Sequence, residues 1–233
     1  MQSRVVVPEL MDDAHLPRSA HEQALAGITR LNFWSRSYAG LWSALRDEAR
    51  RVAPQTLRVL DVATGSGDTP IHLAHRARRD GVRLSLAACD ISATALETAQ
   101  RRAAKNNVAL ELFQCDVVKE PIPQGYDAVI TSLFLHHLSE PAALGLLQSM
   151  AASAARLVLV NDLQRSRLNL AMVTVASRLL SRSPVVHFDG PASVRAAFTI
   201  PEAKALAARA GLSDAVVVPH FPCRWLLTWR KPT

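Results

Sequence analysis

The stretch Arg58-Val-Leu-Asp-Val-Ala-Thr-Gly-Ser-Gly-Asp68 decides the fold, because an apolar strand ends in a carboxylate and is followed by two glycines. Glycine has no Cβ, so Gly65 and Gly67 can adopt positive φ and let backbone N–H groups approach a ligand closely. An ordinary strand-to-helix turn would also explain a single Gly-x-Gly. Asp61, four residues before the first glycine, favours a cofactor-binding turn instead.

Length and composition indicate one folded domain. The chain has 233 residues, of which 49% are hydrophobic and 20% are charged. A chain of this size can bury a full core, and this composition excludes a disordered protein. We expect an N-terminal helical cap over residues 1–54 and one cofactor-binding unit over residues 55–233.

The net charge of +7 raises the question of a nucleic-acid partner. The arginines are scattered along helix-like segments, without a basic tail or a concentrated patch. We therefore predict a solvated basic surface and no nucleic-acid partner. Attraction to anionic substrates or to membrane surfaces is a secondary expectation.

The three cysteines are odd in number and lack metal-ligand spacing, which favours a reduced interior. Acidic residues occur within the first 13 positions, so the start does not resemble a secretory signal. No apolar stretch reaches the length of a membrane span. We expect a cytoplasmic location, with peripheral membrane contact left open.

Short apolar runs alternate with helical stretches along the chain. Residues 19–52 show apolar positions at helical spacing. Strands separated by helices pair in parallel through right-handed crossovers, so the alternation predicts a doubly wound α/β sheet. The expected strands are Leu57–Val62, Leu84–Asp90, Val108–Cys115, Asp127–Ser132 and Leu157–Asn161, and the expected helices begin at Thr69, Ser92, Glu140 and Arg167.

The C-terminal part breaks this alternation. Ala215–Val218 and Arg224–Arg230 follow one another across two prolines with no room for a helix, so we expect them to pair antiparallel. The predicted fold class is a seven-stranded, mostly parallel, Rossmann-like sheet with an antiparallel C-terminal hairpin. Ser181–Pro191 is predicted as an irregular insertion that borders a substrate pocket.

Three carboxylates lie at matching strand ends. Asp61, Asp90 and Asp116 end or follow the first three predicted strands. In open parallel sheets, ligands bind beyond the carboxyl ends of the strands, where the winding direction reverses. Helix capping would explain any one of these acids. All three together favour one site, with Asp90 suited to ribose hydroxyls and Asp116 to an adenine amino group.

From Leu57 onward, the sequence resembles the class I S-adenosylmethionine-dependent methyltransferases. In that family the glycine turn binds the amino-acid part of the cofactor, and the next two acids bind ribose and adenine. Ala63 departs from the glycine of many members, but members similar to the ubiquinone and menaquinone methyltransferases also have alanine there. The resemblance implies S-adenosylmethionine as cofactor and a binding site formed by Asp61, Ala63, Gly65, Gly67, Asp68, Asp90, Ile91, Asp116, Val117 and Ser132.

Two other functions remain open. A nicotinamide-dependent oxidoreductase would need Gly-x-Gly-x-x-Gly to hold a pyrophosphate. Pro70 occupies the third glycine position and cannot donate its own N–H, which disfavours a pyrophosphate site. The other alternative is a non-catalytic, cofactor-binding regulatory protein.

The substrate side offers candidates for proton transfer. His136 and His137 follow the fourth predicted strand, and histidine exchanges protons near neutral pH. Such a histidine can also merely close the cofactor pocket. We predict His137, His136 and Asp162 as catalytic residues, and Asn161, His187 and Trp34 as substrate-binding residues. No metal is expected, because divalent-metal ligands are not recognised after the fourth strand.

The expected acceptor is small and apolar. The helix at Arg167–Leu180 is strongly apolar with basic ends, which suits a phenolic, quinone-like or lipid-like substrate. Pro8-Glu-Leu-Met-Asp-Asp13 and Asp189–Phe198 are similar to segments of bacterial methyltransferases associated with type III polyketide synthases. This resemblance implies methylation of an alkyl-phenol or alkyl-quinol. We expect transfer to oxygen rather than to carbon.

Overall fold

A seven-stranded sheet organises the chain, and its strands lie in the order β3-β2-β1-β4-β5-β7-β6. The computed structural model describes residues 3–12, 15–34 and 38–232. β1 to β5 run parallel, whereas β7 pairs antiparallel with both β5 and β6. This arrangement confirms the predicted fold class. The strands are β1 Leu57–Val62, β2 Leu84–Asp90, β3 Glu111–Gln114, β4 Tyr126–Ser132, β5 Ala154–Leu163, β6 Val216–His220 and β7 Arg224–Arg230.

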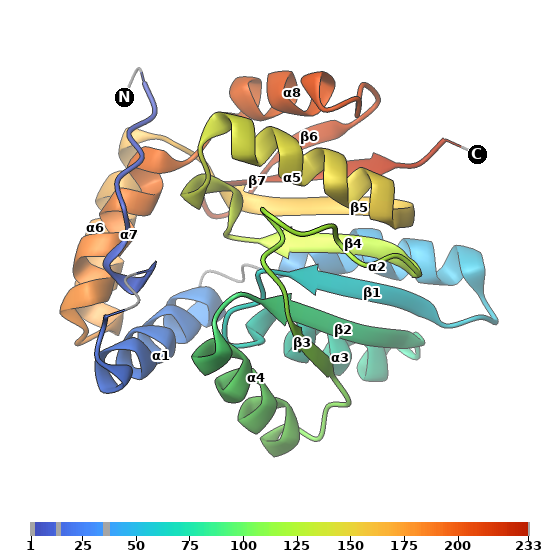
Figure 1. Cartoon of the computed structure of the whole chain (residues 1–233), viewed down its shortest axis with the longest axis horizontal. Helices are drawn as coiled ribbons and strands as arrows, with labels where there is room; N and C mark the ends of the chain where they lie inside the picture. Colours follow the sequence, from blue (N-terminus) through green and yellow to red (C-terminus); the bar gives the residue numbers. More distant parts are fainter. Residues whose placement is uncertain (1–2, 13–14, 35–37, 233) are drawn as a thin grey trace.

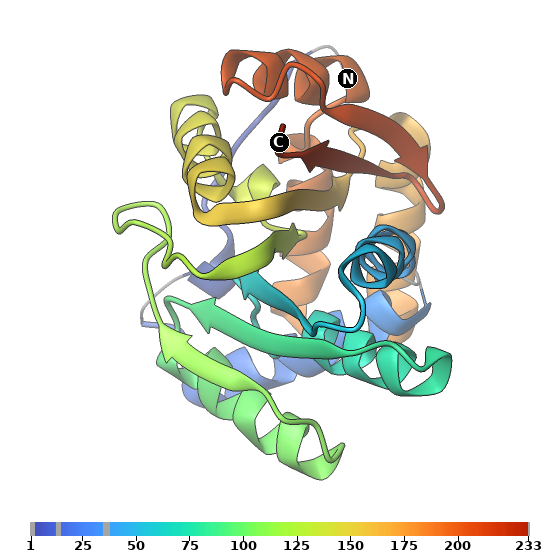
Figure 2. The ribbon, with the colours of Figure 1, turned by 90° about the vertical axis from the view of Figure 1, so that its right-hand side faces the viewer.

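Helices cover both faces of the sheet and one of its ends (Figures 1 and 2). α2, α3 and α4 cover one face, α5 and α8 cover the other, and α1, α6 and α7 stand beyond the carboxyl ends of the parallel strands. The helices are α1 Arg18–Trp34, α2 Ala39–Val52, α3 Asp68–Asp80, α4 Ala93–Lys105, α5 Glu140–Ser153, α6 Arg167–Leu180, α7 Pro184–Ala196 and α8 Ile200–Arg209, with short 3₁₀ helices η1 Leu10–Asp12 and η2 Leu135–His137.

The central strands are apolar on both sides because helices cover both faces. Successive side chains of a strand point to opposite faces. Leu60 and Val62 of β1 therefore belong to the core beneath α5 and α8. Leu57 and Val59 belong to the core beneath α2 and α3. A run that is apolar on both sides is typical of a buried parallel strand.

The N-terminal cap is partly built into this sheet. Leu41 and Leu45 of α2 are fully buried in the core over β1 and β5. A separate cap is therefore represented mainly by α1, and the division at residue 54 stays a prediction.

The expectation of an irregular insertion at Ser181–Pro191 is wrong, because most of this segment forms α7. Pro184 lies in the first helical turn, where proline is tolerated, and Pro191 lies inside the helix. Gly190 lets α7 approach α6, since a Cβ there would lie 3.0 Å from the side chain of Val173. Packing between the two helices outweighs the local preference of these residues for a loop.

Trp225 of β7 should stabilise the fold through a buried hydrogen bond. Its side chain is fully buried, and its Nε1 donates to the carbonyl oxygen of Phe198 at 3.1 Å. Trp225→Phe keeps an aromatic ring but removes this donor. We expect the free energy of unfolding to fall by about 1–3 kcal/mol, measured by urea denaturation.

Phe221→Leu serves as the control, because Phe221 is exposed at the turn between β6 and β7. Its change should stay within about 0.5 kcal/mol. Equal stability of wild type and Trp225→Phe would contradict the assigned role of the hydrogen bond.

Candidate functional site

The winding of the sheet reverses between β1 and β4, which are neighbours although β2 and β3 separate them in the sequence. Ligands bind at such a reversal, beyond the carboxyl ends of the strands. Ala63 follows β1 with φ of 55°, and Leu133 follows β4 with φ of 60°. Non-glycine residues in this conformation cost about 1–3 kcal/mol and cluster at functional sites. The backbone therefore marks this edge as the candidate site.

The glycine turn is open on one side and closely packed on the other. Gly65 and Gly67 have φ of 56° and 74°, as the sequence predicts. A Cβ on Gly65 would meet no atom within 4 Å, whereas one on Gly67 would lie 3.0 Å from the Cβ of Ala99 in α4. The turn thus leaves space for a ligand beside Gly65 and holds α4 close beside Gly67.

Asp61 is a buried carboxyl group at the end of β1. The hydroxyl of Thr64 donates to its Oδ2 at 2.7 Å. Burial raises the pKa of Asp61 to about 7; the hydrogen bond from Thr64 opposes this shift, and the charges of Asp90 and Asp68 add to it. Near neutral pH, a cationic group close to Asp61 would favour its charged form.

Asp90 joins the end of β2 to the glycine turn. Its Oδ2 accepts from the N–H of Gly65 at 2.7 Å, and its Oδ1 accepts from the N–H of Ser92 at 2.9 Å. Burial raises the pKa of Asp90, although both N–H groups oppose the shift. The next residue, Ile91, is 59% exposed and offers an apolar surface beside this carboxylate.

Asp116 lies just beyond β3. Its side chain pairs with Lys119 at 3.0 Å and accepts from the N–H of Val118 at 3.1 Å. The hydrogen bond from Lys119 lowers the pKa of Asp116, so this carboxylate is charged at neutral pH. The side chain of Val117 is buried in the core, and only its backbone remains for ligand contact.

Asp68 links three elements around the glycine turn. It forms an ion pair with Arg102 of α4 and accepts from the hydroxyls of Thr29 in α1 at 3.0 Å and Ser66 at 3.2 Å. These contacts show a positioning role for Asp68, and direct contact with a cofactor stays a prediction. Pattern reasoning missed Thr29 and Arg102, because neither lies near the turn in the sequence.

Asn161 and Ser132 connect the ends of β5 and β4. The amide of Asn161 donates to the hydroxyl of Ser132 at 2.9 Å, and the N–H of Leu133 donates to the carbonyl oxygen of Asn161 at 2.8 Å. Asn161 is fully buried. These bonds hold Leu133 in its strained conformation, and substrate contact by Asn161 stays a prediction.

His136 and Asp162 form a buried pair. The backbone N–H of His136 donates to Oδ2 of Asp162 at 2.9 Å, and its Nδ1 lies 2.6 Å from Oδ1. A carboxylate in this position fixes the proton on Nδ1 and leaves Nε2 as an acceptor. His137 is half-buried, and the centres of the two imidazole rings lie 4.4 Å apart. The structure thus brings together all three predicted catalytic residues.

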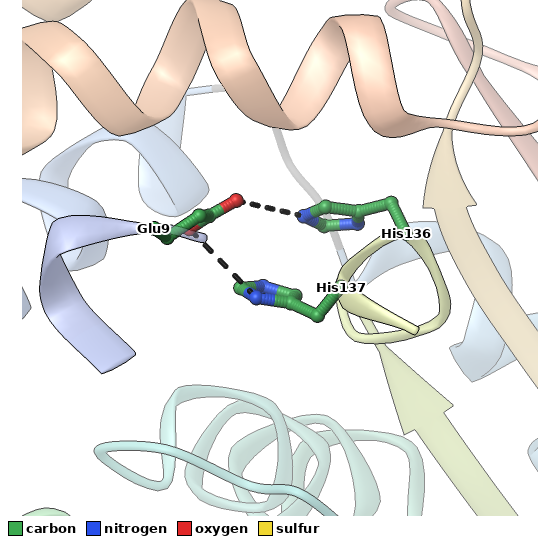
Figure 3. A group of neighbouring side chains, drawn as sticks. All are labelled: Glu9, His136 and His137. Carbon is green, nitrogen blue, oxygen red and sulfur yellow. Dashed lines mark ion pairs between the residues drawn. The ribbon is translucent and has the colours of Figure 1, made fainter. Parts of the chain in front are cut away.

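Residues 3–12, which we term the N-terminal strap, place Glu9 beside both histidines (Figure 3). Its carboxylate oxygens lie 3.9 Å from Nε2 of His136 and 3.8 Å from Nδ1 of His137. Ser193 of α7 donates its hydroxyl to Glu9 at 2.5 Å. Arg4 donates to the carbonyl oxygen of His136 at 3.1 Å.

Sequence reasoning assigned no chemistry to Glu9 or Arg4. The segment from Pro8 to Asp13 stood out only as a family-like outer motif.

Two predicted substrate-binding residues, His187 and Trp34, have no described contact with the residues above. His187 is on α7, where its Nε2 lies 2.8 Å from the carbonyl oxygen of Ser181. With Val5 and Phe188 it lines an open surface hollow of about 360 Å³. Trp34 ends α1, but its side chain is outside the described residues. Substrate contact by either residue stays a prediction.

Residues 59–156 match a family model described as "Methyltransferase domain", and this match spans the glycine turn, Asp90 at the end of β2 and Asp116 after β3. These residues, fewer than half of the chain, are similar to methyltransferase domains. The predicted family and its cofactor, S-adenosylmethionine, are thereby confirmed.

A curated relative agrees with this match. The ubiquinone/menaquinone biosynthesis C-methyltransferase UbiE of Rickettsia felis is 38% identical over 76 residues, covering 32% of this chain. The chain spans only 29% of the length of that curated relative.

Solved structures share the fold. Magnesium protoporphyrin IX methyltransferase from Synechocystis PCC 6803 with bound SAH aligns over 88% of this chain and 99% of its own, with a TM-score of 0.57 and 17% identity. An O-methyltransferase family 2 protein from Planctomyces limnophilus in complex with apigenin aligns over 95% of this chain and 63% of its own, with a TM-score of 0.59 and 18% identity.

Ionisation of Asp61 should control binding of the cofactor's ammonium group. Because burial raises the pKa of Asp61 from 3.8 to about 7, the free protein keeps this carboxyl protonated below that pH. An ammonium group nearby favours the anion, so the affinity for S-adenosylhomocysteine should rise with pH up to about 7 and then level off. Isothermal titration calorimetry over this pH range measures the effect.

Asp61→Asn should flatten this pH profile. A raised pKa in the folded state also means that the contribution of Asp61 to folding stability is fully present below pH 3.8 and is lost as the pH rises through about 7. The same rise of affinity with pH in wild type and Asp61→Asn would rule out Asp61 as its source.

Proposed function

We propose that this protein transfers the methyl group of S-adenosylmethionine to a small aromatic or lipid-like acceptor, with oxygen preferred over carbon. The open glycine turn between Asp61 and Asp90 carries the proposal. Its free space beside Gly65 fits a ligand, and its buried and partly buried carboxyl groups, Asp61 and Asp90, suit a cationic nucleoside that has no phosphate to neutralise. In a thermal-shift assay, stabilisation by S-adenosylhomocysteine but not by NADH would distinguish this protein from a nicotinamide-dependent enzyme.

Each part of the cofactor has a suitable partner at this edge. The glycine turn and Asp61 would hold the amino-acid part, and Asp90 would accept hydrogen bonds from ribose. Ile91 would lie against the adenine ring, and Asp116 would accept from its amino group. The cofactor, when bound, supplies an electrophilic methyl group on a sulfonium. The protein's part is alignment of the acceptor and removal of its proton.

Activation of the acceptor falls to the group of His136, His137 and Asp162. Asp162 orients His136 through two hydrogen bonds, at 2.9 and 2.6 Å. Both histidines lie in η2, directly after β4, and β4 is the neighbour of β1, which leads into the glycine turn. An imidazole here is suited to take a proton from a phenol or quinol hydroxyl as the oxygen attacks. Glu9 would stabilise the positive charge that forms.

The acceptor class rests on relatives and on surface chemistry. The curated relative is named for ubiquinone and menaquinone biosynthesis, and one solved neighbour binds apigenin. The resemblance to enzymes associated with type III polyketide synthases also favours a phenol or quinol. The proposed acceptor is therefore a phenolic lipid of polyketide origin.

Contact with membranes would give access to such an acceptor. In the described parts of the chain, no helix is long and apolar enough to cross a bilayer. The outer face of α6 nevertheless exposes four apolar side chains at helical spacing, each between 40% and 78% exposed: Leu168, Met172, Val175 and Leu179. Arg167 and Arg178 on the same helix are exposed and suit anionic headgroups. We propose a cytoplasmic enzyme whose α6 binds anionic membrane surfaces.

Two variants should separate cofactor binding from turnover. Asp90→Ala removes the ribose partner and should weaken S-adenosylhomocysteine binding by about tenfold or more. His137→Ala should leave this binding nearly intact and lower kcat by about a hundredfold. Calorimetry measures binding, and transfer from radiolabelled S-adenosylmethionine to alkylresorcinols, quinols and flavonoid-like phenols measures turnover.

Asp214→Ala, at an exposed loop position, is the matched control and should change neither quantity. Equal loss of cofactor affinity in Asp90→Ala and His137→Ala would place the histidine in the cofactor pocket. Tight binding without transfer to any acceptor would favour a regulatory protein instead.

The membrane contact has its own test. Val175→Asp combined with Leu179→Asp should lower binding to phosphatidylglycerol vesicles by about tenfold or more, because two apolar side chains lose their burial in the bilayer. Cosedimentation measures binding. Val216→Asp, a similarly exposed valine on β6, is the control and should bind as wild type. Equal binding by all three proteins would exclude α6 as the contact.

A further inference from the structure

Glu9, His136 and His137 direct metal-binding atoms into one small space, although the strap and η2 are far apart in the sequence (Figure 3). The candidate ligand atoms, one from each residue, all lie within 4.8 Å of one another. Two imidazole nitrogens and one carboxylate are a common donor set for divalent transition metals. His136 is buried, and Glu9 and His137 are only partly exposed.

Asp162 provides a second, independent feature of a metal site. Metal-binding histidines usually donate their other ring N–H to a carboxylate, which fixes the tautomer and the direction of the ring. Nδ1 of His136 lies 2.6 Å from Asp162, and both side chains are buried. Nε2 is thereby left as an acceptor that faces the carboxylate of Glu9 at 3.9 Å. A cation between these two acceptors would be bound by both of them.

The distances fit an ion after a small adjustment. Zinc binds histidine nitrogen and carboxylate oxygen at about 2.0–2.2 Å, so neighbouring ligand atoms on a tetrahedral ion lie about 3.4 Å apart. The carboxylate of Glu9 lies 3.9 Å from His136 and 3.8 Å from His137. Closing these two gaps takes about half an ångström, and a pair of ligand atoms at the upper bound of 4.8 Å would have to close by about 1.4 Å.

We propose that Glu9, His136 and His137 bind one divalent transition-metal ion of the zinc type. Mg²⁺ and Ca²⁺ are disfavoured, because they prefer oxygen ligands. Three protein ligands leave a fourth position open, as in catalytic zinc sites. A hydroxyl bound there would have a lowered pKa. The ion would also attach the strap to η2, since Glu9 belongs to the strap and the histidines to η2.

This proposal rests on side-chain geometry and does not require methyl transfer. With an ion bound, the histidines serve as ligands, and the ion takes over their proposed part in activating the acceptor hydroxyl. Metal binding is therefore measured without S-adenosylmethionine, so that it can fail or succeed separately from the proposed function.

Zinc titration of the chelator-treated 233-residue protein tests the site. Wild type should bind one equivalent of Zn²⁺ in competition with a chromophoric chelator, and excess Mg²⁺ should not displace it. Glu9→Gln keeps the side-chain shape but removes the charge, and should weaken binding by about tenfold or more. Asp162→Asn, which changes a positioning residue, should weaken it by about 10–100-fold.

Two controls keep the result interpretable. His75→Ala removes an exposed histidine of α3 and should bind zinc as wild type. Thermal unfolding without metal shows whether each variant folds, and added Zn²⁺ should raise the Tm of wild type and His75→Ala more than that of Glu9→Gln. Absence of stoichiometric binding by wild type, or equal affinity in wild type and Glu9→Gln, would overturn the proposal.

Discussion

The hydrogen bond from the N–H of Gly65 to the carboxylate of Asp90 determines the shape of the cofactor edge. It holds the turn after β1 against the end of β2, and it occupies one oxygen of a partly buried acid. Asp61 is desolvated behind the same turn, where its charge is opposed by Asp90 and Asp68. The protein therefore gathers carboxyl groups in a confined place, where a cationic ligand would favour the charged form of Asp61.

The sheet could be predicted from the sequence because its signals are local. β1, β2 and β7 begin and end at the residues that apolar runs and flanking breakers indicate. α7 could not be predicted, because Pro184, Gly190 and Pro191 locally favour a loop, and only packing against α6 reverses that preference. The strand expected at Val108–Cys115 is shorter, and β3 covers only Glu111–Gln114.

The candidate site likewise contains residues that could be predicted from the sequence and residues that could not. Asp61, Gly65 and Asp90 could be predicted because each ends or follows a strand, and parallel strands bring their ends together. The pairing of His136 with Asp162 follows from β4 and β5 being neighbours. Glu9 could not be predicted, because no periodicity connects an irregular N-terminal segment to a loop beyond β4. Its position depends on contacts of the strap with α7, including the hydrogen bond from Ser193.

The position of the strap affects how an acceptor could reach the histidines. Arg4 donates hydrogen bonds to the carbonyl oxygens of His136 and Leu138, while the carboxylate of Glu9 lies beside the rings of His136 and His137. One short segment thus touches both the backbone and the side chains of η2. If the strap moved away from η2, both imidazoles would become exposed and would lose the Glu9 carboxylate in the same movement. The step that admits an acceptor would then also remove the group that stabilises positive charge on the histidines.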